Sequence, residues 1–221
     1  MSKIFLGKNA MGNKIFYEEN KDLIVEAATR LGFGTCIAIP TLIESKENII
    51  VFDIQENFYT LTKKYRESIG YKTLKIDNDT TDLEIEKILS EEKFTIYIGV
   101  NLKNFCEKSI SSFYTKVLRK ILGLIKEKKI NCLTIVNEFP LIFSAHPYLL
   151  EYRCINNRFL LRIQTMEQLK KINSIDKSLK IEDFSIIKFD FQTNSIIFGE
   201  ETYEKNYWFK DLKYKKLLLE E

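Results

Sequence analysis

The sequence predicts an α/β fold with three layers, in which helices cover both faces of a mainly parallel central sheet. Short apolar runs of strand length recur along the chain, and segments with apolar residues at helical spacing separate them. Several runs are apolar at nearly every position, which is typical of strands buried on both faces. Since 221 residues with 45% apolar side chains suffice for a substantial core, we predict a single domain over residues 1–221.

The first half of the chain alternates between short strands and helices. Pro40 lies past the first turn of the first expected helix and should either kink it or cost an internal hydrogen bond, because proline donates no backbone hydrogen bond. Gly70 follows the second expected helix and should end it. The expected strands are 14–17, 23–27, 49–54 and 72–76, and the expected helices are 35–44 and 58–69.

The second half continues this pattern and ends in a hairpin. Thr81 and Glu84 have the spacing of a capping box, which predicts the start of a helix. Two apolar runs within 184–198 predict an antiparallel hairpin at the edge of the sheet. The aromatic and basic tail, 200–221, should pack over that edge, with base stacking as the alternative. The other expected strands are 94–100, 132–136 and 160–163, and the other expected helices are 81–91, 109–128 and 166–173.

The composition limits the classes of function. A net charge of +3 is nearly balanced, so no strong overall attraction to nucleic acid or membranes is expected. The basic helix at 109–128 predicts either a solvated face or a surface that contacts DNA. The four cysteines lack Cys-x-x-Cys spacing and indicate buried thiols in a reducing compartment. Because no apolar stretch approaches the ~18 residues of a membrane span, we predict a cytoplasmic protein.

A glycine-containing turn after the expected strand 23–27 has the spacing of a phosphate-binding P-loop. A P-loop requires Gly-x-x-x-x-Gly-Lys-Ser/Thr, because the glycines let backbone N–H groups surround the phosphates and the lysine neutralises them. In this chain Ala27 stands at the first glycine and Phe33 at the lysine. The turn therefore predicts either a degenerate phosphate site or an ordinary tight turn before a helix.

The order of motifs along most of the chain resembles the nucleotide-binding domain of the type IV secretion coupling proteins, the conjugative DNA-transfer motors. The segments that carry the resemblance are 5–42 (FLGK to AIPTL), 49–77 (IIVFD to TLKID), 95–105, 132–142 and 160–169. The resemblance implies a RecA-like P-loop NTPase-type domain, with short N-terminal strands in 1–22. It also implies that the all-helical insertion, which the family carries after the position of residue 77, is absent from this chain.

Within this resemblance the catalytic positions are altered. Besides Ala27 and Phe33, Asn137 stands where the metal-holding Walker B aspartate belongs. Losing one preorganised charge contact usually costs ~10²- to 10³-fold in rate, so ATPase activity is not expected. Glu138 and Gln164 would be catalytic only in an active enzyme, and neither a metal nor a cofactor is predicted. The degenerate cofactor-binding loop that the resemblance implies consists of Thr29, Arg30, Gly32, Phe33, Gly34 and Thr35.

These departures predict a non-catalytic relative of the coupling proteins, a pseudo-ATPase that serves as an interaction or assembly component of a DNA-transfer or secretion apparatus. Its expected partners are other type IV secretion or conjugation proteins, including an active coupling-protein relative, which would recruit it to the inner face of the cell membrane. The alternative is a divergent NTPase or DNA-translocation motor. That motor would bind ATP and Mg²⁺ with Arg30 or a neighbouring subunit in place of the missing lysine.

Overall fold

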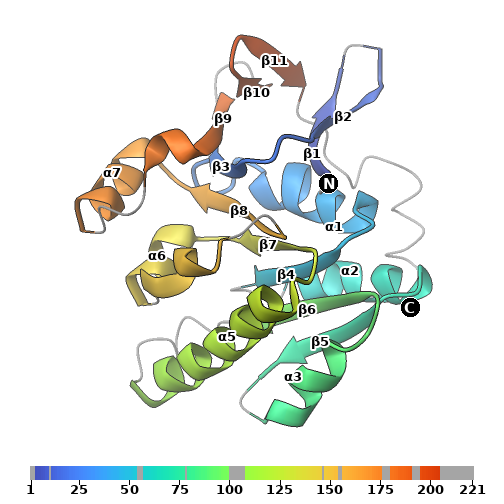
Figure 1. Cartoon of the computed structure of the whole chain (residues 1–221). Coiled ribbons are helices and arrows are strands. Elements are labelled where there is room, and N and C mark those ends of the chain that lie inside the picture. The colour runs from blue at the N-terminus through green and yellow to red at the C-terminus, as the bar shows by residue number, and fades with distance from the viewer. Residues whose placement is uncertain are drawn as a thin grey trace.

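One sheet of eleven strands runs through the part of the chain that the structure describes (Figure 1). The computed structural model describes residues 3–9, 11–53, 57–77, 79–99, 108–145, 147–153, 156–175, 180–190 and 195–204. The strand order is β2-β1-β11-β10-β9-β3-β8-β7-β4-β6-β5. The strands are β1 (Ile4–Lys8), β2 (Lys14–Tyr17), β3 (Asp22–Glu26), β4 (Asn48–Asp53), β5 (Lys72–Ile76), β6 (Phe94–Gly99), β7 (Cys132–Val136), β8 (Asn157–Ile163), β9 (Phe184–Asp190), β10 (Ser195–Phe198) and β11 (Glu201–Glu204).

Neighbouring strands from β9 to β5 are parallel, and the remaining pairs are antiparallel. This arrangement confirms the predicted mainly parallel sheet and the hairpin formed by β9 and β10. In the parallel part, β3 pairs with β8 and β9, while β7 lies between β8 and β4. Because parallel strands point the same way, the C-terminal ends of β3, β8 and β7 meet at one edge of the sheet.

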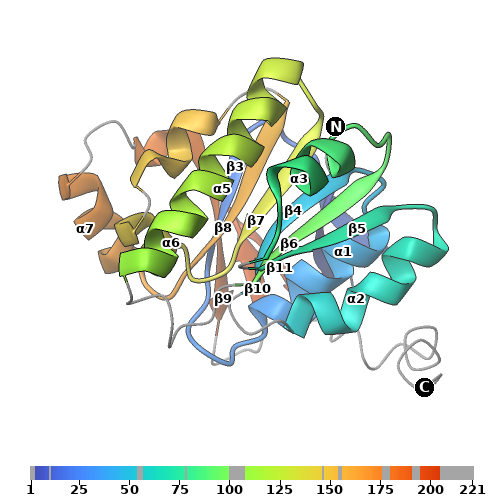
Figure 2. The same ribbon diagram turned by 90° about the horizontal axis from the view of Figure 1, so that it is seen from below.

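Helices cover both faces of the sheet and give the predicted three layers (Figure 2). Adjacent strand residues point to opposite faces, so Ile50 and Phe52 join the apolar cluster under α5, whereas Ile49 and Val51 join the cluster under α1. Figure 2 shows α3, α5 and α6 on one side of the strands and α1 and α2 on the other. The helical segments are η1 (Phe33–Ala38), α1 (Ile39–Glu44), α2 (Asn57–Ser68), α3 (Asp82–Ile88), α5 (Lys108–Lys128), α6 (Phe139–Ala145), η2 (Pro147–Tyr152), α7 (Met166–Ile175) and η3 (Ile181–Asp183).

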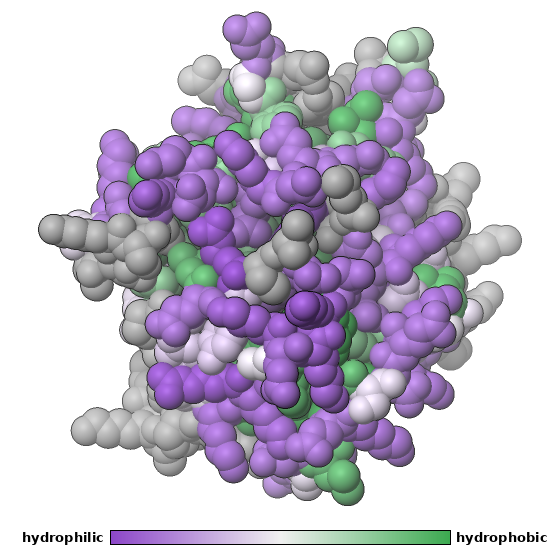
Figure 3. Space-filling view, in the orientation of Figure 1, coloured by the Kyte–Doolittle hydropathy of each residue, from purple (hydrophilic) through white to green (hydrophobic). Residues whose placement is uncertain are grey.

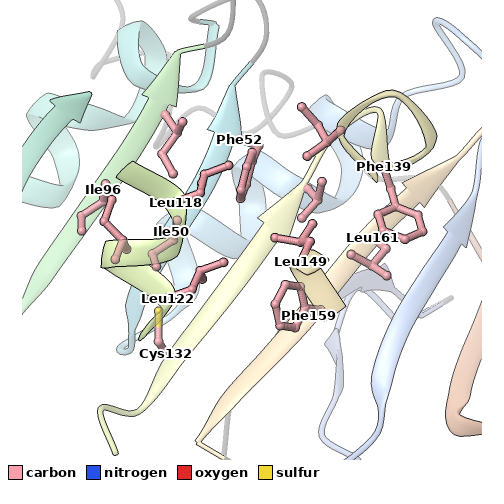
Figure 4. Packing of buried hydrophobic residues seen from close by; sticks show 14 of the residues in the cluster. Ile50, Phe52, Ile96, Leu118, Leu122, Cys132, Phe139, Leu149, Phe159 and Leu161 are labelled. Carbon is pink, nitrogen blue, oxygen red and sulfur yellow. The ribbon is translucent and has the colours of Figure 1, made fainter. Parts of the chain in front are cut away.

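The core on the α5 face also anchors the short helix α6. Figure 4 shows Leu118 and Leu122 of α5 lying over Ile50 of β4, and Phe139 at the start of α6 lying beside Leu161 of β8. All five side chains have at most 1% of their surface exposed. Since burying one such apolar side chain stabilises the fold by ~1.5–3 kcal/mol, Phe139 fixes the position of the residues directly before it.

Two helix boundaries follow the signals in the sequence. Gly70 has φ +91°, and the Tyr71 and Gly70 N–H groups donate to Arg66 O and Glu67 O, a Schellman ending for α2. At the start of α3, the Thr81 hydroxyl accepts from Glu84 N–H, and the Glu84 carboxylate accepts from Thr81 N–H. Both predictions are confirmed, because these local bonds depend on residues close in sequence.

Arg66 of α2 is fully buried and holds the end of α1. Its guanidinium donates to the carbonyl oxygens of Leu42 (3.2 Å), Ser45 (2.6 Å) and Glu47 (2.7 Å) and to the Thr95 hydroxyl (2.9 Å). Burial lowers the pKa of Arg66, because desolvation disfavours its charged form. The C-terminal carbonyls of a helix carry partial negative charge, so this cation complements the end of α1.

The predicted position of the hairpin at the sheet edge is wrong. Beyond β10 the sheet continues through β11, and β11 pairs with β1 at Lys8 and Glu204. Strand β1 lies within the amino-terminal segment 1–22, where short strands were expected, but its bounds were not predicted, because its five-residue run contains Gly7 and its partners lie both nearby and almost 200 residues away. Part of the tail thus forms a strand, while its aromatic residues after Glu204 lie outside the described residues.

The first helix begins earlier than predicted and in a wider form. Residues Phe33–Ala38 form a π-helical segment, in which Ile39 N–H donates to Gly34 O, and α1 follows. Pro40 lies at the first turn of α1, where its missing N–H costs least. The helix accommodates Pro40 through a change of helix type just before the proline.

The surface seen in Figure 3 is mainly hydrophilic. On α5, Lys120 Nζ lies 2.8 Å from Glu86 Oε1, and the Arg119 guanidinium lies 4.3 Å from the centre of the Tyr148 ring. These contacts favour the solvated-face interpretation of the basic helix. Of the helices in the described ranges, none combines the length and apolar character that crossing a membrane requires. Two of the predicted buried thiols, Cys36 and Cys132, are buried, and neither forms a disulfide within the described part of the chain.

Candidate functional site

Three strand ends bring the predicted site residues together at one edge of the sheet. The glycine turn follows β3, Asn137 and Glu138 follow β7, and Gln164 follows β8. These segments line a pocket of about 590 Å³. Every residue that the sequence assigned to the site lines it, and so do Ala28, Leu141 and Arg162. These residues therefore lie around one pocket, although the first and the last of them are more than 130 positions apart in the chain.

The glycine turn is a tight reversal between β3 and η1. Arg30 has φ +67° and Gly32 has φ +101°, so both lie in the left-handed region, which only glycine adopts without cost. Gly32 O accepts from Cys36 N–H at 2.7 Å, which connects the turn to the helix. Arg30 and Thr29 are exposed, so their side chains lie at the rim of the pocket and not in its floor.

Phe33, which stands at the lysine position, is a core residue. Only 3% of its surface is exposed, and it belongs to the apolar cluster that also contains Ala27, Cys36 and Ile37. Its ring therefore forms part of the pocket wall, where a lysine would otherwise carry a charge. Gly34 has a packing role, since a Cβ there would approach the Phe58 ring to 3.2 Å.

A buried arginine connects the three segments behind the turn. Arg162 of β8 donates from Nε to Ala27 O (3.1 Å) and from Nη1 to Asn137 Oδ1 (3.3 Å). The same Nη1 forms a salt bridge with Glu138 Oε1. The Arg162 side chain is 6% exposed and that of Glu138 is 27% exposed. Asn137 and Glu138, which follow β7, therefore both interact with Arg162 of the same chain.

Gln164 completes this network from the end of β8. Its Nε2 donates to Glu138 Oε2 at 3.2 Å, so both oxygens of that carboxylate have a partner. Its backbone N–H donates to Gln168 Oε1 at 2.8 Å, which fixes Gln164 against the start of α7. Since each oxygen of a carboxylate can accept a hydrogen bond, the Gln164 amide and Arg162 together orient the Glu138 carboxylate.

Glu138 also has an unusual backbone conformation. Its φ is +60°, a conformation that is costly for a residue with a Cβ and that recurs at functional sites. Its carbonyl oxygen accepts from Leu141 N–H (3.0 Å) and Ile142 N–H (3.2 Å), which starts α6. The burial of Phe139 in the core holds the chain in this conformation.

Sequence reasoning missed Arg162, although a signal for it exists. The residue lies in the run Phe159–Ile163, which is otherwise apolar and which forms the last five residues of a strand buried along its whole length. A charged side chain in such a strand requires a buried partner of opposite charge. Glu138 is that partner, and the two residues are close because β8 lies next to β7.

The polar side chains that line the pocket are one carboxylate, two amides, two hydroxyls and two guanidiniums. The described residues contain no cluster of three or more His, Cys, Asp or Glu side chains that could hold a metal ion. The one buried cation of the pocket, Arg162, already bonds to Glu138. The exposed side chains at the rim of the pocket can bind small polar groups, whereas at its floor the charges of Arg162 and Glu138 compensate each other.

Comparisons with known proteins support a relation to conjugation for the first part of the chain. Residues 3–84 match the model of a family described as "Type IV secretory system Conjugative DNA transfer". The matched residues run from β1 into α3 and include the glycine turn. This match supports a type IV secretion family related to conjugation.

Whole-chain comparisons add little to this match. No curated protein matches the chain. A solved structure from Pyrococcus horikoshii OT3, determined in a structural study, aligns with 82% of this chain and 87% of its own, at 14% identity and a TM-score of 0.39.

Proposed function

We propose that this protein is a non-catalytic component of a DNA-transfer or secretion apparatus, related to the conjugative coupling proteins. The match of residues 3–84 supports the connection with conjugative DNA transfer. The observation that carries the loss of catalysis is Phe33, which lies within the matched segment and is buried in the core at the position of the phosphate-binding lysine. Its partners would be other conjugation or secretion proteins, including an active coupling-protein relative at the inner face of the membrane.

The residues of the pocket do not suit the Mg²⁺ and ATP that the family resemblance implies. Phosphoryl transfer on such a fold needs a lysine and a metal ion to spread the charge of the terminal phosphate. Phe33 supplies no charge, and the oxygen atoms of Asn137 and Glu138 accept hydrogen bonds from Arg162. The proposal therefore assigns this domain a role through its surfaces.

A divergent NTPase is supported less well. In that hypothesis Arg30 replaces the lysine, but Arg30 is exposed and its backbone is in the left-handed conformation. The carboxylate of Glu138, which would activate water, is bonded on both oxygens. Binding of DNA through α5 is also disfavoured, because acidic and aromatic side chains already contact its cations.

Two measurements test the proposal. Purified protein should release no phosphate from ATP and Mg²⁺ above a protein-free blank, and turnover that a Glu138→Gln variant abolishes would contradict it. In the host, deleting the protein should lower the frequency of DNA transfer. An Arg30→Ala variant, which removes the exposed cation that the alternative motor would use, should restore transfer as well as the unaltered chain, whereas an NTPase that relied on Arg30 would not be restored.

A further inference from the structure

We infer that Arg162 is a built-in counter-ion of the candidate site, which takes the place of a divalent cation and keeps one out. This inference rests on the proposed function, because it explains how a domain without catalysis excludes the metal ion that catalysis would need. Three features of the structure support it: the convergence of oxygen atoms, the position of β8, and the charge balance.

Oxygen atoms from separate segments converge on one guanidinium. Ala27 supplies a backbone carbonyl at the end of β3, Asn137 supplies an amide oxygen after β7, and Glu138 supplies a carboxylate oxygen. Carbonyl, amide and carboxylate oxygens are the ligands that Mg²⁺ and Ca²⁺ use in proteins. The guanidinium therefore bonds to three oxygen atoms of the kinds that a hard cation requires.

The position of β8 explains how a single side chain reaches all of these atoms. β8 lies between β3 and β7 in the sheet, so a residue near its C-terminal end is adjacent to the ends of both neighbours. Arg162 pairs in register with Val25 of β3, two residues before Ala27. Ala27 N–H in turn donates to Ile163 O at 2.9 Å, which holds the turn and β8 together.

The charges of the site balance without a metal ion. Arg162 is almost fully buried, and its positive charge is compensated by Glu138. A divalent cation among the same oxygen atoms would lie within a few ångströms of the guanidinium, where like charges repel strongly in a partly buried environment. It would also have to displace hydrogen bonds that Glu138 receives from Arg162 and Gln164.

Manganese binding, followed by electron paramagnetic resonance in the absence of nucleotide, tests this inference. The wild-type protein should show no saturable Mn²⁺ site in the pocket. Arg162→Met, which keeps the apolar stem and removes the charge, should gain one saturable Mn²⁺ site, at least about tenfold tighter than any residual Mn²⁺ binding by the wild-type protein. Arg162→Lys, the matched control that keeps the charge, should not gain the site. Adding Glu138→Gln to Arg162→Met should abolish the binding that was gained.

Several outcomes would overturn the inference. A wild-type site that Glu138→Gln removes would show that Arg162 does not exclude the ion, and this comparison holds even if Arg162→Met fails to fold. Folded Arg162→Met without Mn²⁺ binding, or equal gains in the methionine and lysine variants, would show that the charge of Arg162 is not the cause. ATP turnover by the wild-type protein would instead refute the proposed function, whatever the Mn²⁺ measurements show.

Discussion

Replacing Arg66 with methionine tests how the buried guanidinium stabilises the fold. The side chain is fully buried, contacts the carbonyl oxygens of Leu42, Ser45 and Glu47, and stacks on Tyr71 with 3.5 Å between guanidinium carbon and ring centre. Methionine would fill much of the same space without donating a hydrogen bond. The variant therefore separates the hydrogen bonds of Arg66 from its apolar packing.

The expected effect is a loss of about 3 kcal/mol in the free energy of unfolding. Each of the three carbonyl oxygens that loses its donor costs ~1–3 kcal/mol when it stays buried. Against this loss, removing a desolvated cation returns several kcal/mol, as replacements of buried ion pairs by apolar residues show. We expect the carbonyls to dominate, because they belong to the end of α1 and to the segment that leads into β4, and the sheet fixes that segment.

Urea unfolding at 25 °C, followed by circular dichroism, measures this loss. With an m value of about 2–3 kcal/mol/M, the midpoint of Arg66→Met should fall by about 1–1.5 M. Lys63→Met is the matched control, since Lys63 lies one turn earlier on the same helix and is 38% exposed; it should change stability by less than about 0.5 kcal/mol. An unchanged or higher midpoint for Arg66→Met would refute the reasoning, because the relief of desolvation would then exceed the loss of hydrogen bonds.

Two further predictions concern the pocket wall and the amino-terminal strands. Phe33→Ala should lower the free energy of unfolding, measured in urea, by about 3–5 kcal/mol, as expected for a buried aromatic. Leu141→Ala is the control, since Leu141 lines the same pocket but is 38% exposed, and it should cost less than about 1 kcal/mol. Equal costs would show that Phe33 is not a core residue. Burial raises the pKa of Tyr17 to about 12, so the unfolded chain loses the phenolic proton at a lower pH than the folded protein does. The stability that Tyr17 contributes is therefore fully present below about pH 10 and is lost as the pH rises towards 12. Urea midpoints between pH 9 and 11.5 should therefore decline more steeply for the wild-type protein than for Tyr17→Phe, and parallel declines would contradict this assignment.

The sequence predicted those elements whose signals are local. Strand β5 has the predicted bounds, and the glycine end of α2 and the capping box of α3 are both present, because the residues that make them lie within a few positions of one another. The start of β8 was predicted three residues late. Asn157 and Arg158 are polar, yet they are buried, and Asn157 Oδ1 accepts from the Thr134 hydroxyl at 2.8 Å. A bond to another strand cannot be read from polarity alone.

The composition of the candidate site was predicted, but its internal bonding was not. Motif order grouped the glycine turn with Asn137, Glu138 and Gln164, and all of them line one pocket. The role of Arg162 depends on β8 lying between β3 and β7, which is a property of sheet order. The π-helical turn before Pro40 likewise depends on how η1 packs under the sheet, so the sequence predicted only a kink or a lost hydrogen bond.

The pairing of β11 with β1 has a consequence for synthesis of the protein on the ribosome. Strands β1 and β2 emerge first, but they join the rest of the sheet only through β11, which ends at Glu204. Until then, the Phe5 N–H bond to the Thr41 hydroxyl (3.0 Å) and the packing of β1 on η1 and α1 are what can hold this hairpin in place. A chain released before residue 201 would therefore present two open strand edges, one on β1 and one on β10, to other polypeptides.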